Sequence, residues 1–323
     1  MIKDILVFSL SSNTHLTDKV CDLLGINRSE AEVLHFADGE CLATSKVDVR
    51  GKKIYIIQST CSPVNDRIME LLIFIDGIKR ANCKEITLII PYYGYARQDR
   101  IAHRNEPISA RMVADLFSNA GVTRVLTVEL HTPQIQGFFS VPLDNLTPTS
   151  IFAKYLLNKF KTLHISTNEV AIVAPDHGAM YRARDLSNAI ANSSIVIIDK
   201  RRPRPNVAEI TNIIGEIKDK VCVMVDDIID TGGTILAGAR TLKDKGARSV
   251  YICASHALFS HNALGRFEES DFIDEVLVTD TIEHPEFYNS QKVKVVSVSE
   301  MIADVIKSHE SHETIKDKYT RFQ

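Results

Sequence analysis

The sequence predicts an α/β protein built from two doubly wound domains with mainly parallel sheets. Short apolar runs of strand length recur from one end of the chain to the other, and segments with helical spacing lie between many of them. The runs are too many for one ordinary sheet, and a length of 323 residues favours about two domains.

The predicted strands are brief stretches rich in valine and isoleucine, bounded by polar and turn-forming residues. Their alternation with helical segments is typical of βαβ units, in which neighbouring strands run parallel. In chain order the strands are Ile5–Phe8, Val33–Phe36, Ile54–Ile57, Ile86–Ile90, Val125–Val128, Val170–Ala174, Ile195–Ile198, Val221–Val225, Val250–Ala254, Val276–Val278 and Val293–Val296.

The predicted helices occupy several of the gaps between these strands. They are Asn65–Arg80, Ser109–Ala120, Ser150–Phe160, Ala179–Ala191 and Gly233–Lys245. Gly121 and Gly246 follow two of them, at the position where glycine commonly ends a helix. Near the C-terminus Glu300–Ile306 has helical spacing, and the polar segment 307–323 is expected to be peripheral.

The best boundary between the two domains is the segment Val141–Pro148. It combines prolines with Asp-Asn turn chemistry and precedes a new helical pattern. We therefore predict a first domain over residues 1–147 and a second over residues 148–304.

Composition excludes several functional classes. The net charge of −3 gives no electrostatic argument for nucleic-acid binding. No apolar stretch approaches the roughly 20 residues of a membrane span, and the N-terminus does not have the pattern of a signal peptide. The 6 cysteines are scattered without a Cys-x-x-Cys pair, which is typical of buried thiols in a reducing cytoplasm.

The run from Val223 to Thr234 predicts a binding site for a sugar phosphate. An apolar strand is followed by a pair of acids and then by a glycine-rich turn that opens a helix. Such a turn can aim backbone N–H groups at one phosphate, and the helix N-terminus favours its negative charge. The acids just upstream can accept hydrogen bonds from the vicinal hydroxyls of a ribose. The candidate residues are Asp226, Asp227, Asp230, Thr231, Gly232, Gly233 and Thr234.

Two other stretches have the chemistry of a nucleotide site, and each follows a predicted strand. In one, Phe36 offers a stacking face and the acids beside it offer hydrogen-bond acceptors. In the other, Arg97 can bind a phosphate or stack on a base, and Gln98 can contact an adenine edge. The candidate residues are Phe36, Asp38, Gly39, Glu40, Arg97 and Gln98. Each stretch alone is also compatible with an ordinary loop.

Metal and charge-stabilising candidates stand after other strands. His131 and Asp176 end strands at the carboxyl edge, where they could share a Mg²⁺ bound to nucleotide phosphates, although Mg²⁺ prefers oxygen ligands. The basic run Lys200–Pro205 can be a solvated loop or a mobile cationic loop that stabilises a phosphoryl-transfer transition state. A Walker-type G-x-x-x-x-G-K-[ST] run is absent from the sequence.

Together these pieces resemble the ribose-phosphate pyrophosphokinase family. The resemblance covers nearly the whole chain and rests on separated motifs in the right order. The motifs are Phe36–Glu40, Tyr95–Asp99, Glu129–His131, Gln134–Phe139, Asp199–Pro203 and Asp226–Thr234. It implies two tandem phosphoribosyltransferase-like domains, with the tail 305–323 packing back on the first.

The resemblance also implies the reaction and its participants. The β,γ-diphosphoryl group of ATP would pass to the 1-hydroxyl of ribose 5-phosphate, with Mg²⁺ both free and as MgATP. Phe36, Asp38, Gly39, Glu40, Arg97 and Gln98 would hold ATP, and His131 and Asp176 would hold Mg²⁺. Lys200 and Arg202 would be the catalytic cations, and Arg202 would join the Asp226–Thr234 run in binding ribose 5-phosphate. The resemblance further implies a cytoplasmic homo-oligomer, namely a hexamer whose active sites are shared between subunits. It also implies phosphate or ADP as effectors.

The chain departs from the familiar pattern after Asp176. The family usually reads Asp-x-Gly-Gly there, whereas this chain reads Asp176-His177-Gly178-Ala179. Ala179 removes backbone freedom and His177 adds a bulky titratable group, which affects the expected diphosphate contacts. Asp48 stands near Arg50 where a serine is common, which bears on the effector response.

Two alternatives fit parts of the sequence. A purine phosphoribosyltransferase has a loop nearly matching Asp226–Thr234, but such enzymes are usually shorter and lack the other motifs. A non-catalytic regulatory subunit of the same family would have lost the catalytic cations, and both Lys200 and Arg202 are present.

Overall fold

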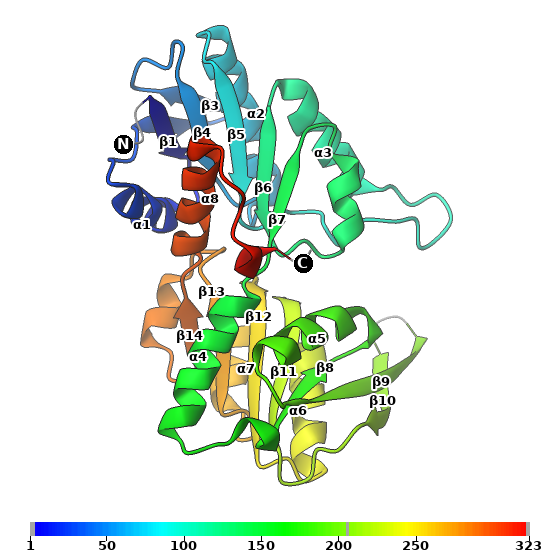
Figure 1. Ribbon diagram of the computed structural model, residues 1–323. Coiled ribbons are helices and arrows are strands. Elements are labelled where there is room, and N and C mark those ends of the chain that lie inside the picture. Colours follow the sequence, from blue (N-terminus) through cyan, green and yellow to red (C-terminus); the bar gives the residue numbers. More distant parts are fainter. Residues whose placement is uncertain (1–3, 205–206, 321–323) are drawn as a thin grey trace. The chain divides into compact units, whose positions relative to one another are not determined.

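The computed structural model describes residues 4–204 and 207–320, and the side chains of residues 200–211 and 318 lie outside this description. The chain forms two compact units (Figure 1). The first comprises Met1–Thr147, Thr281–Glu283 and Ser297–Gln323, and the second Pro148–Asp280 and His284–Val296.

The first unit is built on a 5-stranded sheet with the order β1-β4-β5-β6-β7. All of its neighbouring strands are parallel, so their carboxyl ends share one edge. The strands are β1 (Ile5–Ser9), β4 (Lys53–Ile57), β5 (Glu85–Ile90), β6 (Arg124–Val128) and β7 (Leu143–Leu146).

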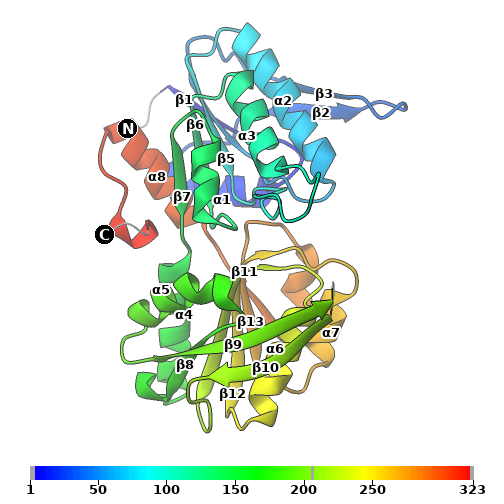
Figure 2. The same cartoon turned by 90° about the vertical axis from the view of Figure 1, so that its right-hand side faces the viewer.

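Helices cover both faces of this sheet (Figure 2). The helices are α1 (Thr14–Leu24), α2 (Val64–Arg80), α3 (Ser109–Ala120) and α8 (Ser299–Ser311). One face holds α2 and α3, whose buried side chains pack with those of β1, β4 and β5. The opposite face holds α1 and α8, which contact each other.

A separate 2-stranded hairpin projects from the first unit. Its strands β2 (Ala31–His35) and β3 (Cys41–Ser45) are antiparallel, and β3 contacts α2. The turn between them contains Phe36 and Glu40.

The second unit is built on a 7-stranded sheet with the order β10-β9-β8-β11-β12-β13-β14. Only β10 is antiparallel to its neighbour among the pairs in this sheet as described. The strands are β8 (Val170–Ala174), β9 (Ser194–Arg204), β10 (Val207–Ile214), β11 (Val221–Ile229), β12 (Ser249–Ala257), β13 (Glu275–Thr279) and β14 (Val293–Val296).

Two apolar cores lie on the two faces of this sheet. Cys222 and Met224 of β11 pack with α6 and α7, whereas Val223 and Val225 pack with α4 and α5. The strand is therefore apolar on both faces, as expected for a strand buried between helical layers. The helices are α4 (Thr149–Thr162), α5 (Met180–Ala189), α6 (Gly233–Asp244) and α7 (Ala263–Glu269).

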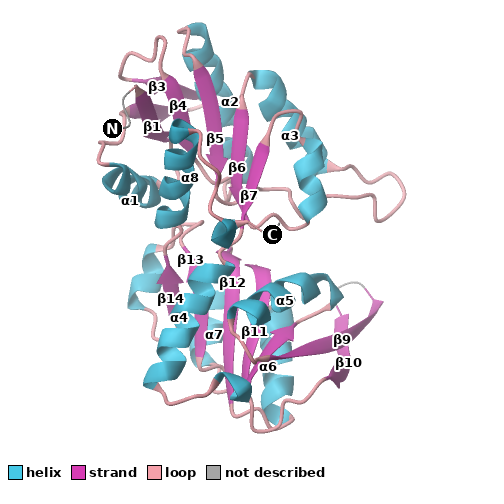
Figure 3. Ribbon diagram, viewed as in Figure 1, coloured by secondary structure: helices cyan, strands magenta, loops and turns pink. Residues whose placement is uncertain are grey.

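The α/β class and the mainly parallel sheets predicted from the sequence are confirmed. Several predicted boundaries differ from the structure, and the two largest differences concern strands of the second unit (Figure 3). The strand predicted to end at Val225 continues to Ile229 because it pairs with β12 over that length. The basic run predicted as a loop after Ile198 instead continues β9 to Arg204, paired with β10 in a hairpin.

The C-terminal segment belongs to the first unit over a longer stretch than the sequence predicts. Residues 297–304, expected in the second domain, lie in the first unit because the apolar face of α8 packs with α1. The described part of the tail is not wholly peripheral, since Tyr319 is only 2% exposed. No helix within 4–204 or 207–320 is long and apolar enough to cross a membrane.

Candidate active site

The phosphate loop of the second unit joins β11 to α6. Gly232 caps the helix with φ 75° and ψ −3°, a left-handed conformation that favours glycine. A Cβ on Gly232 would lie 2.7 Å from Cε2 of Phe267, so the ring also excludes a side chain. A Cβ on Gly233 would meet open space, and Gly233 and Thr234 are exposed. Backbone groups of this turn are therefore accessible to a ligand.

The N-terminus of α6 has the features of an anion site. Among the described residues, no side chain caps it and no acid lies in its first turn. The first backbone N–H groups of a helix have no partner within the helix, and the helix dipole favours an anion beside them. Thr231 and Thr234 add exposed hydroxyl groups next to these donors.

The acid pair lies inside β11, whereas the sequence predicted that it follows the strand. Asp227 is 2% exposed, and its Oδ1 lies 3.4 Å from Nη2 of Arg182. Asp226 keeps part of its surface exposed, and its Oδ1 accepts the N–H of Asp227 at 2.9 Å. The pair thus has one buried, ion-paired carboxylate and one that reaches the surface.

The environment of Asp226 favours its protonated form. Burial by surrounding protein raises the pKa of Asp226 well above its ordinary value, although the residue is partly exposed. The charge and hydrogen bond of Asp227 raise the pKa further, and the Arg182 cation opposes them. An acid held at this pKa is suited to a ligand that brings hydrogen-bond donors or positive charge.

Arg182 is a further candidate site residue, and no sequence motif predicts it. It lies in α5, is only 5% exposed, and stacks its guanidinium 4.4 Å from the centre of the Tyr181 ring. Its burial against Asp227 depends on tertiary packing. The available sequence signal is an arginine in the helix that follows Asp176.

Asp176 follows the neighbouring strand β8 and begins the short 3-10 helix His177–Ala179. Its Oδ1 accepts the N–H of Ala179 at 3.1 Å. Because β8 and β11 are parallel neighbours, Asp176 and the acid pair share one edge of the sheet. The charge of Asp176 acts on the pKa of Asp226, in agreement with this proximity.

Ala179 and His177 do not strain this loop. Ala179 has φ −85° and ψ −1°, a right-handed conformation open to any residue, and it is buried. The side chain of His177 is 70% exposed, and its Nε2 lies 3.5 Å from Oδ1 of Asp199. The departure from glycine at 179 therefore leaves the backbone unstrained.

Strand order explains why these groups gather. The chain leaves β8 for β9 on one side and later returns to β11 on the other side of β8. In open α/β sheets, ligands bind beyond the carboxyl ends of strands at such a reversal. Asp176 and the phosphate loop lie at this position.

The Arg97–Gln98 loop of the first unit is fixed by its neighbours. Oε1 of Gln98 accepts a hydrogen bond from the hydroxyl of Ser109 at 2.5 Å, and Arg97 is exposed. A Cβ on Gly94 would lie 2.4 Å from the carbonyl oxygen of Thr60, which requires glycine there. The loop is thus held firmly while Arg97 remains accessible.

His131 lies beside that loop. It follows β6, and the hydroxyl of the adjacent Thr132 donates to Oδ2 of Asp99 at 2.8 Å. Asp99 itself follows Gln98 directly. The structure therefore brings His131 near the Arg97–Gln98 loop within one unit.

The Phe36–Glu40 turn ends the β2–β3 hairpin. The N–H of Phe36 donates to the carbonyl of Glu40 at 2.8 Å, and that of Glu40 donates to Oδ1 of Asp38 at 3.1 Å. Gly39 has φ 93°, which the turn requires. Phe36 is 51% exposed, so its ring is presented to solvent.

For the candidate cations Lys200 and Arg202, only the backbone belongs to the described structure. The backbones of Lys200 and Arg202 lie in β9, and their side chains lie outside the described residues. Over the described part of the chain, no group of at least 3 His, Cys, Asp or Glu residues could alone hold a metal ion. A site for Mg²⁺ would then need oxygen atoms of a bound nucleotide in addition to protein side chains.

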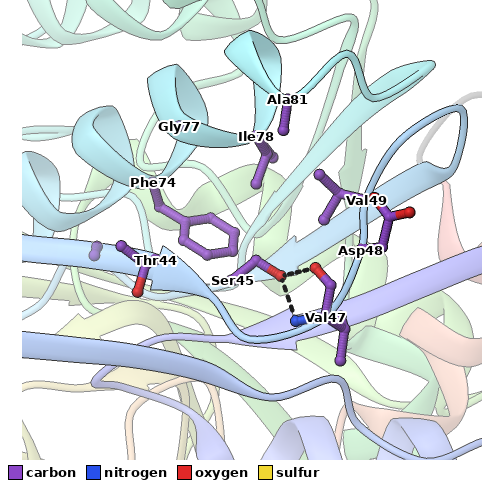
Figure 4. A pocket seen from close by; sticks show the side chains of 10 residues that line it. Thr44, Ser45, Val47, Asp48, Val49, Phe74, Gly77, Ile78 and Ala81 are labelled. Atoms are coloured by element: carbon purple, nitrogen blue, oxygen red, sulfur yellow. Dashed lines mark hydrogen bonds between the residues drawn. The ribbon is translucent and has the colours of Figure 1, made fainter.

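A cavity of about 250 Å³ lies away from these residues, between β3, the loop after it and α2 (Figure 4). Phe74, Gly77 and Ile78 line it from the helix, and Val47 and Asp48 from the loop. It is smaller than a typical ligand pocket, which is about 300–1,000 Å³.

The two-unit α/β fold and the phosphate loop at a strand reversal define an enzyme of the phosphoribosyltransferase-like class. Comparison with known proteins narrows this class. The N-terminal domain of ribose phosphate pyrophosphokinase matches residues 5–121, and the phosphoribosyl synthetase-associated domain matches residues 169–319.

Relatives match over nearly the whole chain. Ribose-phosphate pyrophosphokinase 1 of Listeria monocytogenes is 44% identical over 306 residues, 94% of both chains. The ribose-phosphate pyrophosphokinase of Caldanaerobacter subterraneus is 47% identical over 300 residues, 93% of both. The crystal structure of phosphoribosylpyrophosphate synthetase from Mycobacterium smegmatis superposes with a TM-score of 0.88 at 33% identity, covering 96% of this chain and 100% of that one.

The chain belongs to the ribose-phosphate pyrophosphokinase family and is an enzyme of that type. Neither the purine phosphoribosyltransferase nor the regulatory-subunit alternative is favoured, because both halves match pyrophosphokinases.

Proposed function

We propose that the protein transfers the β,γ-diphosphoryl group of ATP to the 1-hydroxyl of ribose 5-phosphate, giving 5-phosphoribosyl 1-diphosphate and AMP. The observation that carries the proposal is the phosphate loop beside the acid pair at the strand reversal. It is supported by full-length relatives named for this activity.

Ribose 5-phosphate would bind with its phosphate at the turn Asp230–Thr234. The N-terminal amides of α6 and the hydroxyls of Thr231 and Thr234 would contact the phosphate. Asp226 and Asp227 would accept hydrogen bonds from the ribose hydroxyls, with Arg182 holding Asp227 in place. Burial of the acids strengthens such hydrogen bonds in the bound state.

ATP would bind through Arg97, Gln98 and the turn formed by Phe36, Asp38, Gly39 and Glu40. Arg97 is exposed and anchored by a rigid loop, as a phosphate ligand requires. Phe36 exposes its ring, as stacking on a base requires. Because the turn lies at the tip of a projecting hairpin, we propose that it serves an active site shared with another subunit.

His131 and Asp176 would hold Mg²⁺ together with ATP oxygens. The carboxylate of Asp176 is a hard oxygen donor beside the phosphate loop, and Mg²⁺ often takes one or two carboxylates plus phosphate oxygens and water. The carboxylate of Asp176 therefore fits the ion, and His131 would supply a nitrogen ligand. Bound Mg²⁺ would neutralise phosphate charge during the transfer.

Lys200 and Arg202 would stabilise charge on the transferred group. Attack by the sugar hydroxyl at the β-phosphorus is an in-line displacement that needs positioning and cations more than a strong base. Arg202 would also contact ribose 5-phosphate.

We further propose a cytoplasmic homo-oligomer, a hexamer, with phosphate and ADP as effectors. These features follow from family resemblance. Light scattering with and without phosphate measures the mass and its response.

The test of the proposed reaction is a nucleobase-free incubation with ATP, Mg²⁺ and ribose 5-phosphate. We expect AMP and 5-phosphoribosyl 1-diphosphate to form in equal amounts. Phosphorus NMR measures both products. Release of ADP in place of AMP, or product formation only with a nucleobase, would contradict the proposal. Omission of ribose 5-phosphate is the matched control, because hydrolysis of ATP alone must be small.

A further inference from the structure

Glu70 is a fully buried carboxylate in the middle of α2. Its exposure is 0%, and it accepts hydrogen bonds from the hydroxyl of Ser11 and from Nε2 of Gln58, the latter at 2.7 Å. Nη1 of Arg67 lies 3.3 Å from its Oε1, and Nε2 of His35 lies 3.4 Å from the same atom. A buried carboxylate is costly unless such donors compensate it, so this cluster is a fixed part of the unit.

These donors come from different parts of the first unit. Ser11 follows β1, Gln58 follows β4, and Arg67 lies on α2 itself. His35 is the last residue of β2 and stands directly before Phe36. Glu70 therefore ties the sheet and α2 to the end of the hairpin that carries the Phe36–Glu40 turn.

The side chains on the face of the hairpin that packs on α2 lead along the strands to Glu70. Ala31, Val33 and Ala43 pack into the core that contains α2. The next inward pair along the register is His35 opposite Cys41. Burial and then the charge of Glu70 raise the pKa of the Cys41 thiol, which places both members of this pair near Glu70.

The outer part of the hairpin depends on its packing against α2. A two-stranded hairpin alone is at best marginally stable in water. At the other end of β3 the packing on α2 is interrupted by the cavity lined by Phe74 and Gly77 (Figure 4). Arg67 leaves its buried Nε without a hydrogen-bond partner among the described residues, so its contribution rests on the pairing with Glu70.

The same helix also supports the other nucleotide segment. The hydroxyl of Tyr95, two residues before Arg97, donates to Oδ1 of Asn65 at 2.5 Å. Asn65 lies in the first turn of α2, a little more than one turn before Glu70. The helix thus contacts Tyr95 just before Arg97 and His35 just before the hairpin turn.

We propose that Glu70 is a positioning residue for ATP, acting through His35 to fix the Phe36–Glu40 turn. This inference rests on the proposed nucleotide role of that turn. Glu70 does not touch substrate in this account. It holds the turn in the orientation in which Phe36 can stack on the base.

The test compares steady-state constants of Glu70→Gln and His35→Ala with those of the wild type. We expect the KM for ATP to rise about tenfold in each, because the contact between His35 and the Glu70 carboxylate that fixes the turn is lost. The KM for ribose 5-phosphate should stay within about twofold, and kcat should change little. His35→Arg keeps a hydrogen-bond donor facing Glu70, so its KM for ATP should lie closer to the wild-type value than that of His35→Ala.

Asp66→Asn is the matched control, because Asp66 is an exposed acid one turn earlier on α2. It should leave both KM values unchanged. If Glu70→Gln unfolds the protein, His35→Ala still decides, because the side chain of His35 is 50% exposed and its loss spares the core.

Phe36→Ala separates this inference from the proposed function. A raised KM for ATP in Phe36→Ala, together with unchanged values in Glu70→Gln and His35→Ala, overturns the positioning role alone. An unchanged KM for ATP in Phe36→Ala overturns the nucleotide role of the turn, and the inference with it. Equal changes for both substrates in Glu70→Gln and His35→Ala show a general structural role and also overturn it.

Discussion

Adjacent glycines in the phosphate loop serve different purposes. Gly232 is restricted twice, by a left-handed backbone and by the Phe267 ring against it. Gly233 has open space where a Cβ would lie. The first glycine shapes the turn, and the second leaves room for a ligand.

Gly232→Ala should therefore lower the free energy of unfolding by about 2 kcal/mol or more, since alanine is disfavoured in the left-handed region and would clash with Phe267. Gly233→Ala should change it by less than about 0.5 kcal/mol. Denaturant unfolding of both variants without ligand measures the difference. Equal losses would show that neither the backbone nor Phe267 restricts position 232.

Asp226 gives the ligand-free protein a dependence on pH. Its pKa in the folded protein is raised, whereas in the unfolded chain it is about 4. The stability that the protonated carboxyl provides is complete below about pH 4 and is lost as pH rises through the raised pKa. At neutral pH the acid thus opposes folding, although the proposed ribose site uses it as a hydrogen-bond acceptor.

Asp226→Asn should raise the Tm of the ligand-free protein more at pH 8 than at pH 4, because the amide is never ionised. It should also weaken binding of ribose 5-phosphate. Calorimetric melting at both pH values and titration with the sugar measure the two effects. A Tm rise of the same size at both pH values would refute the electrostatic cause.

Lys200→Ala should lower kcat by on the order of 10³-fold, because a cation on the transferred group would be lost. Ribose 5-phosphate should still bind with nearly unchanged Kd. Single-turnover rates and calorimetry measure these effects, and Lys218→Ala is the control for an exposed lysine in the same unit. An unchanged kcat in Lys200→Ala would exclude a catalytic role.

At the scale of elements, α2 combines support for the nucleotide segments with a packing defect. Gly77 lies in the interior of this helix, a Cβ there would meet nothing within 4 Å, and the residue lines the cavity beneath β3. Glycine in a helix interior costs stability without a steric need here.

Gly77→Ala should therefore raise the free energy of unfolding by about 0.5–1 kcal/mol. Gly94→Ala is the opposite case, because its Cβ would lie 2.4 Å from the backbone oxygen of Thr60. Chemical denaturation of the two variants should show shifts of opposite sign. A loss of stability in Gly77→Ala would mean that the helix needs glycine at this position.

The elements also show what sequence patterns can predict. Val221–Val225 was recognisable because every residue is apolar, but β11 continues through Asp226 and Asp227, whose polarity resembles that of a loop. The burial of Asp227 depends on Arg182, which comes from a helix distant in sequence. The hairpin of β9 and β10 was missed for a similar reason, since Arg-Pro repeats favour a loop while strand pairing depends on the partner.

For the whole molecule, the order of motifs predicts the family and the α/β class. It does not predict how the C-terminal segment packs on the first unit. The polar composition of residues 307–323 conceals one anchor, Tyr319. Its carbonyl accepts the N–H of Thr147 at 3.0 Å, and its hydroxyl lies 3.1 Å from Oδ2 of Asp304. One buried aromatic residue in a polar segment gives no periodicity from which burial can be predicted.

Tyr319→Ala should lower the free energy of unfolding by about 3 kcal/mol, because a buried ring is removed. Tyr319→Phe keeps the ring and loses the hydrogen bond to Asp304, so it should cost about 1 kcal/mol. Urea unfolding of both variants measures the costs. A negligible loss in Tyr319→Ala would show that the tail is peripheral after all.

The placement of α8 has a consequence for synthesis on the ribosome. α1 buries Leu16 and Val20, and α8, which contacts it, emerges roughly 275 residues later, on the order of 15–55 s at usual rates of translation. The unit that begins first is therefore the last to be completed. During that interval the apolar face of α1 that α8 covers is exposed, and such surface can bind other apolar segments before the last helix is made.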